Sequence, residues 1–229
     1  MSYLHKIFIS LTLILCTLIL NAQNSNSIEN SSIIKESFIT FDVFSSLNTF
    51  SPRWRVGYIK GINPKWKIGL NLGYGNKNIS YTYFADKFEE DYELWEIRPE
   101  LYFIIKQNQN SSTYGSVEIY YINHKDIFHD SNYRPVGGGY YSYEQADYLR
   151  QKYGFNFNIG KYIYLEKRFG LNVFTGLGLK IRNNSFSNIV DPAPQEPLDI
   201  DMYDGNEYRE KEGLDYGFNY SIGFKLLFR

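Results

Sequence analysis

Hydrophobic and polar residues alternate along most of this chain from residue 37 onward. The stretch from Trp66 to Gly75 reads WKIGLNLGYG, with a bulky apolar or aromatic residue at every second position and Lys, Gly or Asn between. The last 16 residues, from Leu214 to Arg229, repeat this design. A two-residue period is typical of a β-strand whose faces meet different environments. It predicts strands near 37–47, 52–61, 65–82, 92–106, 112–124, 146–164, 169–186 and 213–228.

The connections between these eight predicted strands fall into two groups. Those near 61–64, 107–111 and 166–169 are brief and those near 83–91, 125–145 and 187–212 are long, while the one near 48–52 is short where a long one is due. Short turns at one end and long loops at the other are typical of an outer-membrane up-and-down barrel. We therefore expect an all-β fold over residues 37–229, an eight-stranded antiparallel up-and-down transmembrane β-barrel. Pro99 cannot donate to the ladder, so a bulge is expected there.

The two faces of the predicted strands differ in glycine content. The polar face carries Gly69, Gly73, Gly154, Gly160, Gly170, Gly176, Gly178, Gly217 and Gly223, with asparagines interleaved. Glycine packs nothing on a water-facing strand, but small residues fit the narrow interior of an eight-stranded barrel. The opposite face, rich in Trp, Tyr, Phe and Leu, is too bulky for that interior. We expect the glycine face to line the lumen and the aromatic face to meet lipid.

With this orientation, five acidic and five basic side chains point into the predicted lumen. Charges in a closed, poorly hydrated space must be partnered, since each unpaired one costs several kcal/mol. We expect a paired network that fills the lumen and leaves no open pore. Its predicted members are Asp42, Arg55, Lys67, Glu96, Arg98, Glu100, Glu118, Lys180, Asp215 and Lys225.

The N-terminus has the pattern of a secretory signal peptide over residues 1–22. Lys6 precedes an uncharged, largely apolar stretch of 14 residues, and Ala22 provides a small residue for cleavage. This stretch is shorter than the roughly 20 residues of a membrane-spanning helix. Residues 23–36 follow as an Asn/Ser-rich leader that is expected to be flexible. The single cysteine, Cys16, lies in the signal peptide, so disulfides and thiolate sites are excluded from the exported chain.

Composition narrows the functional classes further. Among 229 residues, 24 Lys and Arg stand against 25 Asp and Glu, a net charge of −1. A nucleic-acid-binding protein needs clustered cations, so no nucleic-acid partner is expected. No cofactor and no catalytic or metal-binding residue is predicted.

Residues 37–229 resemble a known family, the small eight-stranded outer-membrane β-barrels of the OmpA/OmpX type, and look like the uncharacterised barrels of Bacteroidota. The last strand is the most specific part of this resemblance. Ser221, Gly223, Leu226 and Phe228 are similar to the C-terminal signal that the barrel assembly machinery reads, although Phe228 is penultimate. The resemblance implies an integral outer-membrane protein, surrounded by lipid and inserted by that machinery, with an envelope protein as a possible further partner. It implies no activity, because such barrels serve many functions.

Three features in the predicted long loops are candidate sites. The acidic stretch 188–213 contains Asp199, Asp201, Asp204 and Glu210, but their spacing departs from a calcium loop, so a solvated surface loop is expected and calcium binding stays open. His124 and His129, near Asp126, Asp130 and Ser131, could act as bases in a hydrolase. Tyr140, Tyr141 and Tyr143 follow three glycines and could bind a partner or extend the strands as part of an aromatic rim.

Three functional hypotheses follow from these features. The first is a structural or interaction protein of the outer membrane that acts through its surface loops. The second is an outer-membrane enzyme acting on lipid or peptide. The third is a soluble periplasmic lipocalin-like carrier, with the apolar face turned inward; the glycine-lined polar face opposes it.

Overall fold

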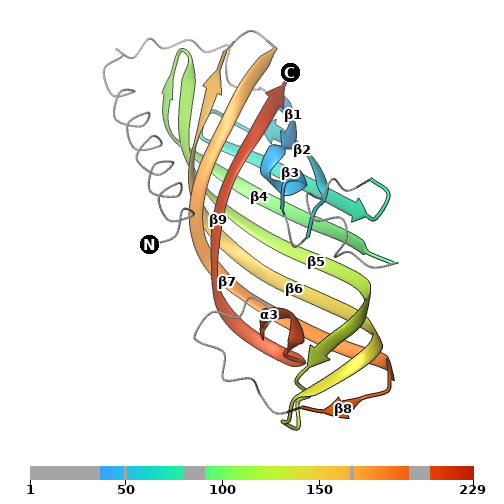
Figure 1. The fold of residues 1–229 in the computed structure, drawn as a ribbon. Helices are drawn as coiled ribbons and strands as arrows, with labels where there is room; N and C mark the ends of the chain where they lie inside the picture. The colour runs from blue at the N-terminus through green and yellow to red at the C-terminus, as the bar shows by residue number, and fades with distance from the viewer. Residues whose placement is uncertain (1–36, 49–50, 80–90, 166–167, 196–206) are drawn as a thin grey trace, which may run out of the picture.

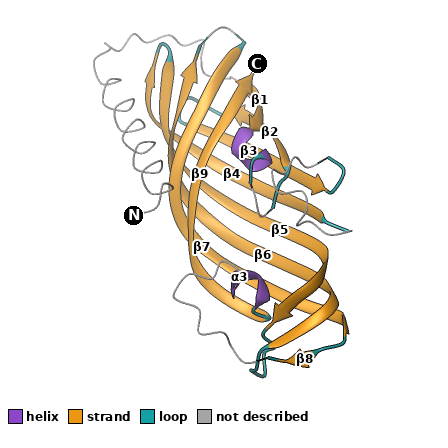
Figure 2. Cartoon of the chain, viewed as in Figure 1, coloured by secondary structure: helices purple, strands orange, loops and turns teal. Residues whose placement is uncertain are grey.

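A computed structural model describes residues 37–48, 51–79, 91–165, 168–195 and 207–229 (Figure 1). The predicted signal peptide at 1–22 and the leader at 23–36 lie outside these residues. The described chain is all-β, with antiparallel strands in one sheet and two four-residue helices (Figure 2). Neither described helix is long and apolar enough to cross a bilayer.

Eight strands form a closed, hydrogen-bonded ring, which we call the strand ring. Each strand pairs antiparallel with the next along the chain, and β1 pairs with β9 to close the circle. A ninth strand, β8 (Ala193–Pro194), adds to β6 outside the ring. The ring consists of β1 (Ser37–Asp42), β2 (Trp54–Gly61), β3 (Trp66–Asn76), β4 (Glu93–Asn108), β5 (Ser111–Tyr133), β6 (Tyr141–Tyr164), β7 (Phe169–Val190) and β9 (Gly213–Phe228).

The strands differ greatly in length, so the two ends of the ring differ. β5, β6 and β7 have 22 to 24 residues, whereas β1, β2 and β3 have 6 to 11. At the end with the short turns all eight strands are present, and we call this the turn end. Beyond it, β5, β6, β7 and β9 continue as a curved four-stranded wall, the trough, in which α3 (Glu207–Glu210) lies (Figure 1).

Several details of the predicted strands are wrong. The strand predicted over 65–82 ends at Asn76. The first strand ends at Asp42 instead of residue 47, because the Asp42 carboxylate accepts a hydrogen bond from the Ser45 amide (3.1 Å) and caps α2 (Val43–Ser46). Residues 125–145 are not a long loop, since β5 and β6 stay paired as far as Tyr133 and Tyr141. The bulge in β4 lies between Ile104 and Lys106, whereas Pro99 pairs with Leu70 in unbroken register.

The strand faces follow the predicted assignment. Along β2, exposed and buried residues alternate without a break: Val56 and Tyr58 are exposed, whereas Arg55 and Ile59 are buried. The outer face of the ring carries exposed large apolar residues on every one of its eight strands. Among them are Ile39, Leu70, Leu72, Ile97, Leu101, Ile119, Phe157, Ile159, Leu177, Leu179 and Phe218. The polar face is enclosed. Burial is therefore inverted relative to a water-soluble sheet protein, in which apolar faces are covered.

Glycines on the enclosed face allow close approach of neighbouring side chains and backbone. A Cβ placed on Gly178 would collide with the backbone carbonyl oxygen of Phe155 on β6, which cannot move without displacing the strand. On Gly217, by contrast, the only atom within 4 Å would be the flexible Cε of Lys180, at 3.3 Å.

We expect Gly178→Ala to destabilise the fold by about 1–3 kcal/mol through overpacking, and Gly217→Ala to have little effect. Urea unfolding of the two variants, followed by tryptophan fluorescence, measures this difference. Equal stability of the two variants would contradict the close approach of β6 and β7 at this position.

Candidate functional site

An ion-pair network crosses the interior of the strand ring. Its centre is Glu96 on β4, a carboxylate only 2% exposed as a residue. Three arginine Nε atoms contact it: Arg53 at 2.8 Å, Arg55 at 2.5 Å and Arg98 at 2.8 Å. Glu96 therefore joins Arg98 on its own strand to Arg55 on β2 and to Arg53, which directly precedes β2.

The network extends from this centre to other strands. Arg55 also contacts Asp42 on β1 (2.5 Å), and Arg98 contacts Glu118 on β5 (2.8 Å). Glu118 in turn accepts a hydrogen bond from Asn156 on β6 (2.8 Å), and Asn219 on β9 donates to Asn156 (2.7 Å). Polar contacts thus run across the interior and connect β1, β2 and β4 with β5, β6 and β9.

A second group of polar contacts lies nearer the turn end. Glu100 on β4 accepts from the hydroxyls of Tyr102 (2.5 Å) and Ser116 (2.6 Å). The Lys225 Nζ atom on β9 lies 3.4 Å from the same carboxylate. This carboxylate therefore has partners on three strands, β4, β5 and β9.

The ten residues predicted for this network occupy the enclosed face, but they do not all pair as expected. Eight are buried, and Lys180 and Asp215 are half-buried. Lys67 lies over the rings of Phe38 (4.9 Å) and Tyr162 (5.1 Å). Lys180 lies over the Tyr208 ring (4.9 Å), and Asp215 pairs with Arg182 (2.9 Å).

Sequence reasoning missed four enclosed cations. They are Arg53, Arg150, Lys152 and Arg182, of which the three arginines are buried and Lys152 is half-buried. Each lies an even number of residues from an enclosed position that the sequence had already identified on the same strand, so it belongs to the same face. Extending the alternation by one or two steps would have identified all four.

Aromatic side chains fill the ring at the turn end. Tyr114 stacks on Tyr162 with 4.5 Å between ring centroids, and Tyr102 meets Tyr114 edge-on at 5.1 Å. These rings belong to a buried cluster that comprises Phe38, Ile59, Tyr102, Ile104, Tyr114, Tyr162, Phe174 and Leu227. Together with the ion-pair network, the cluster places large side chains in the interior of the ring.

The helix α3 is held inside the trough by side chains of β7. The Asn184 Nδ2 atom donates to the backbone carbonyls of Tyr208 (3.2 Å), Arg209 (3.3 Å) and Lys211 (2.9 Å). Arg182 donates to the Tyr208 carbonyl and stacks on its ring at 3.7 Å. The C-terminal part of the predicted acidic loop therefore folds back against the enclosed face.

We expect Asn184→Ala to release α3, because one buried amide satisfies three carbonyls there. Losing about 1–2 kcal/mol of local stability would raise trypsin cleavage after Arg209 and Lys211 about tenfold. Asn183→Ala is the matched control, since Asn183 is the neighbouring, half-buried residue of β7. Equal cleavage rates for both variants would contradict this role of Asn184.

The extended β5–β6 hairpin carries the predicted histidine and tyrosine candidates. His124 is buried, and its Nε2 atom lies 3.6 Å from Asp126 Oδ2. His129 lies on the opposite, odd-numbered face of β5 and is half-buried. The strand thus separates the two histidines by five residues and by face. Tyr140 and Tyr143 are buried and Tyr141 is half-buried, and Tyr143 belongs to an aromatic cluster with Phe128, Ala146, Tyr148 and Phe186.

The calcium-loop candidate lies mostly outside the described residues. Asp199, Asp201 and Asp204 fall in the undescribed stretch 196–206, and Glu210 is buried at the end of α3. Within the described part of the chain, no group of three or more His, Cys, Asp or Glu side chains is placed to hold a metal ion.

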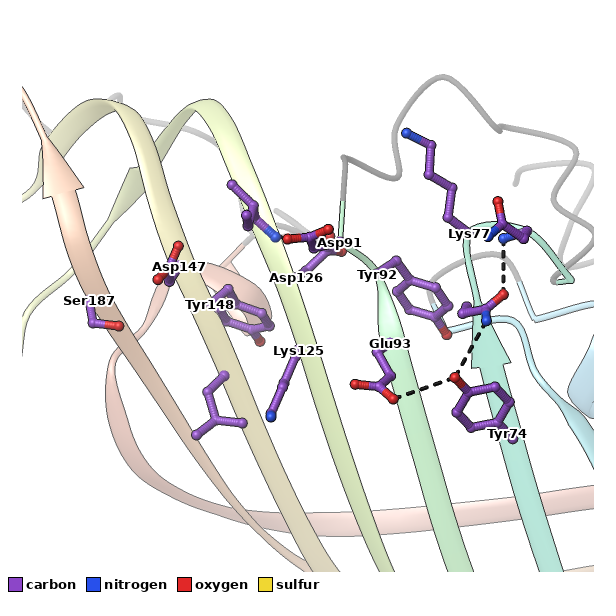
Figure 3. Close-up of a pocket in the computed structure, with 14 residues that line it drawn as sticks. Tyr74, Lys77, Asp91, Tyr92, Glu93, Lys125, Asp126, Asp147, Tyr148 and Ser187 are labelled. Atoms are coloured by element: carbon purple, nitrogen blue, oxygen red, sulfur yellow. Dashed lines mark hydrogen bonds between the residues drawn. The ribbon is translucent and has the colours of Figure 1, made fainter.

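An open groove of about 780 Å³ lies at the loop end of β3 and β4 (Figure 3). Tyr74, Tyr92 and Glu93 line one side, and Asp126, Asp147 and Tyr148 line the other. The Tyr74 hydroxyl donates to Glu93 (3.4 Å). The charged residues that line the groove are Lys77, Asp91, Glu93, Lys125, Asp126 and Asp147.

The residues of the predicted assembly signal occupy both faces of β9. Ser221 is half-buried on the enclosed face and donates to Asn158 Oδ1 (2.6 Å), and Gly223 lies directly beneath the ring of Phe174. Leu226 and Phe228 face outward, where Phe228 meets Phe169 edge-on at 5.5 Å. Recognition by an assembly machinery stays a prediction.

Comparison with known proteins does not add a relative. No family model, no curated protein and no solved structure matches this chain.

Proposed function

We propose that this chain is an integral outer-membrane β-barrel protein with a structural or interaction role, inserted by the barrel assembly machinery and surrounded by outer-membrane lipid. The observation that carries the proposal is the inverted burial of the strand ring. Leu177 is 65% exposed and Phe218 is 85% exposed, while Glu96 and Lys225 are enclosed. A continuous exposed apolar surface of this kind is strongly unfavourable in water and favourable in lipid.

The closed ring supports a membrane-spanning role for a second reason. In hydrocarbon every backbone amide and carbonyl must find a partner, and pairing of β1 with β9 removes the free edges at the turn end. The aromatic cluster and the ion-pair network occupy the interior. These features favour an anchor or platform over an open pore.

The far end of the trough, where β5 and β6 stay paired past Lys125 and Leu149, is the part of this proposed barrel that reaches beyond the membrane. β5, β6 and β7 continue there past the ends of β1 to β4, and their enclosed face is covered by α3 and by the Tyr143 cluster. We infer that this end faces outward and carries the interaction role, while the turn end faces the periplasm. The lipocalin-like alternative loses support, because its apolar face would have to be the enclosed one.

Carbonate extraction and SDS gel mobility test the membrane proposal. We expect the protein to stay in the membrane fraction at alkaline pH and to migrate differently before and after boiling, because a closed barrel resists SDS until heated. A protein that is extracted by carbonate and shows no mobility shift would contradict the proposal.

A further inference from the structure

We propose that the trough contains a binding site for a phosphate-type anion, formed by Arg150, Lys152 and Lys180. These side chains lie on the enclosed faces of β6 and β7, between the ion-pair network and α3. The inference goes beyond the proposed membrane role. It concerns three cations on the enclosed face that form no ion pair with a carboxylate among the described residues.

The ion-pair network on the turn-end side of these residues is balanced. Its four cations, Arg53, Arg55, Arg98 and Lys225, face four carboxylates, Asp42, Glu96, Glu100 and Glu118. None of these carboxylates is left to neutralise a further cation in the trough.

The three cations of the proposed site have no carboxylate partner among the described residues. Arg150 is only 7% exposed, and its Nε atom is buried without a hydrogen-bond partner in the described chain. Lys152 Nζ contacts only the neutral Asn219 Oδ1 (3.4 Å) and the Tyr120 ring (5.5 Å). Lys180 lies over the Tyr208 ring (4.9 Å).

Arg182, the cation next to these three, is not part of the proposed site because it already has a carboxylate partner. Arg182, directly opposite Lys152 in the β6–β7 register, contacts Asp215 (2.9 Å), and Lys211 contacts the same carboxylate (3.3 Å). Tyr208 lies between Arg150, Lys180 and Arg182, with Arg150 Cζ 5.7 Å from its ring. Its ring bounds the site but supplies no formal negative charge.

A buried cation without an ion-pair partner is costly, and Arg150 is only 7% exposed. A tetrahedral anion with one to two negative charges and several acceptor oxygens would satisfy it, because one guanidinium and two ammonium groups can donate to different oxygens. A phosphate or phosphate ester has this chemistry. A carboxylate has only two oxygens, fewer than a phosphate can offer to the three cations on β6 and β7.

The site is reached from the side of the ring. β1 pairs only with residues 225–228 of β9, so within the described chain no strand lies beside residues 213–224. Lys152, Lys180, Gly217 and Asn219 are all half-buried there, and a Cβ placed on Gly217 would have only Lys180 within 4 Å among the described residues. A ligand could therefore reach the cations past the free edge of β9.

The outer surface of the same edge indicates one source of the phosphate. Leu214, Tyr216, Phe218 and Tyr220 form an exposed apolar row along β9. A lipid could place its acyl chains against this row and its phosphate against the cations. The source can equally be a free phosphate compound, so both are tested.

Calorimetry on the purified, detergent-solubilised full chain tests the site independently of membrane insertion. The probes are inorganic phosphate and a short-chain, water-soluble phosphatidic acid. We expect binding of at least one probe by the wild type, and at least tenfold weaker binding by the double variant Lys152→Met/Lys180→Met, because two charge-assisted contacts are lost. The control is Lys60→Met/Lys106→Met, which removes two exposed lysines and the same net charge.

Stability distinguishes a binding site from a structural role. We expect the Lys152→Met/Lys180→Met variant to keep its heat-dependent mobility shift and to unfold at the same or higher urea concentration, since unpaired cations do not stabilise the free protein. Binding of phosphatidic acid alone would assign the site to a lipid headgroup, and binding of phosphate alone to a soluble compound.

Two results would overturn the proposal. One is that the wild type binds neither probe. This includes the case in which binding appears only in the triple variant Asp199→Asn/Asp201→Asn/Asp204→Asn, because the chain's own acidic segment would then occupy the site. The other is equal binding by the double variant and its control. Neither result bears on carbonate extraction, so the membrane proposal stands or fails separately.

Discussion

Glu96→Gln is expected to destabilise the protein by about 3–5 kcal/mol, the cost typical of removing one partner from a buried ion pair. The substitution preserves the size of the side chain and removes only its charge. Arg53, Arg55 and Arg98 would then share an amide that can accept few hydrogen bonds and neutralises none of them. Arg55 would keep Asp42 and Arg98 would keep Glu118, so the largest loss falls on Arg53.

The matched control is Glu93→Gln, three residues earlier on the same strand. Glu93 is exposed and accepts only a long hydrogen bond from Tyr74 (3.4 Å), so the expected change is below about 0.5 kcal/mol. Urea unfolding of the refolded protein measures both values. A loss below about 1 kcal/mol for Glu96→Gln would show that water, and not the carboxylate, compensates the three arginines.

The faces of the strands could be predicted from the sequence because a two-residue period assigns each side chain to one side of the sheet. Knowing that Trp66 and Leu70 share a face also assigns Lys67 and Asn71 to the other. Choosing which face is enclosed required a second argument, the glycine content. The observed burial of the polar face agrees with that choice.

The pairing within the network could not be predicted from the same period. Parity says that Glu96 and Arg55 face inward, but their contact depends on strand register and on side-chain length. Lys180 illustrates the limit: it has the predicted face, yet it lies over the Tyr208 ring. Arg53 was missed although it lies within the predicted strand 52–61 and has the same parity as Arg55.

The long hairpin was missed for a physical reason. Residues 125–145 contain few alternating apolar residues, so their local pattern is that of a loop. Their strands are stabilised by contacts between distant residues, such as Phe128 with Tyr148 (4.7 Å) and Tyr148 with Phe186 (5.3 Å). The helix α3 likewise depends on Asn184 and Arg182, which lie more than 20 residues away in the chain.

Leu177→Arg provides the sharpest energetic test of the proposed membrane location. Leu177 lies on the outer face of β7, opposite Phe157 and Tyr220, which are also exposed. If this position meets the centre of a bilayer, an arginine there costs about 2–4 kcal/mol. If it meets water, the same change costs no more than about 0.5 kcal/mol, because the side chain is 65% exposed.

Val136→Arg is the control, since Val136 is 78% exposed in the turn between β5 and β6, beyond the proposed membrane span. Both variants add one positive charge and replace an exposed apolar residue. Folding into phospholipid vesicles, titrated with urea, should therefore weaken for Leu177→Arg and stay unchanged for Val136→Arg. Equal stabilities would mean that the outer face of the ring does not meet hydrocarbon, and the exposed apolar surface would then have to be covered by protein instead.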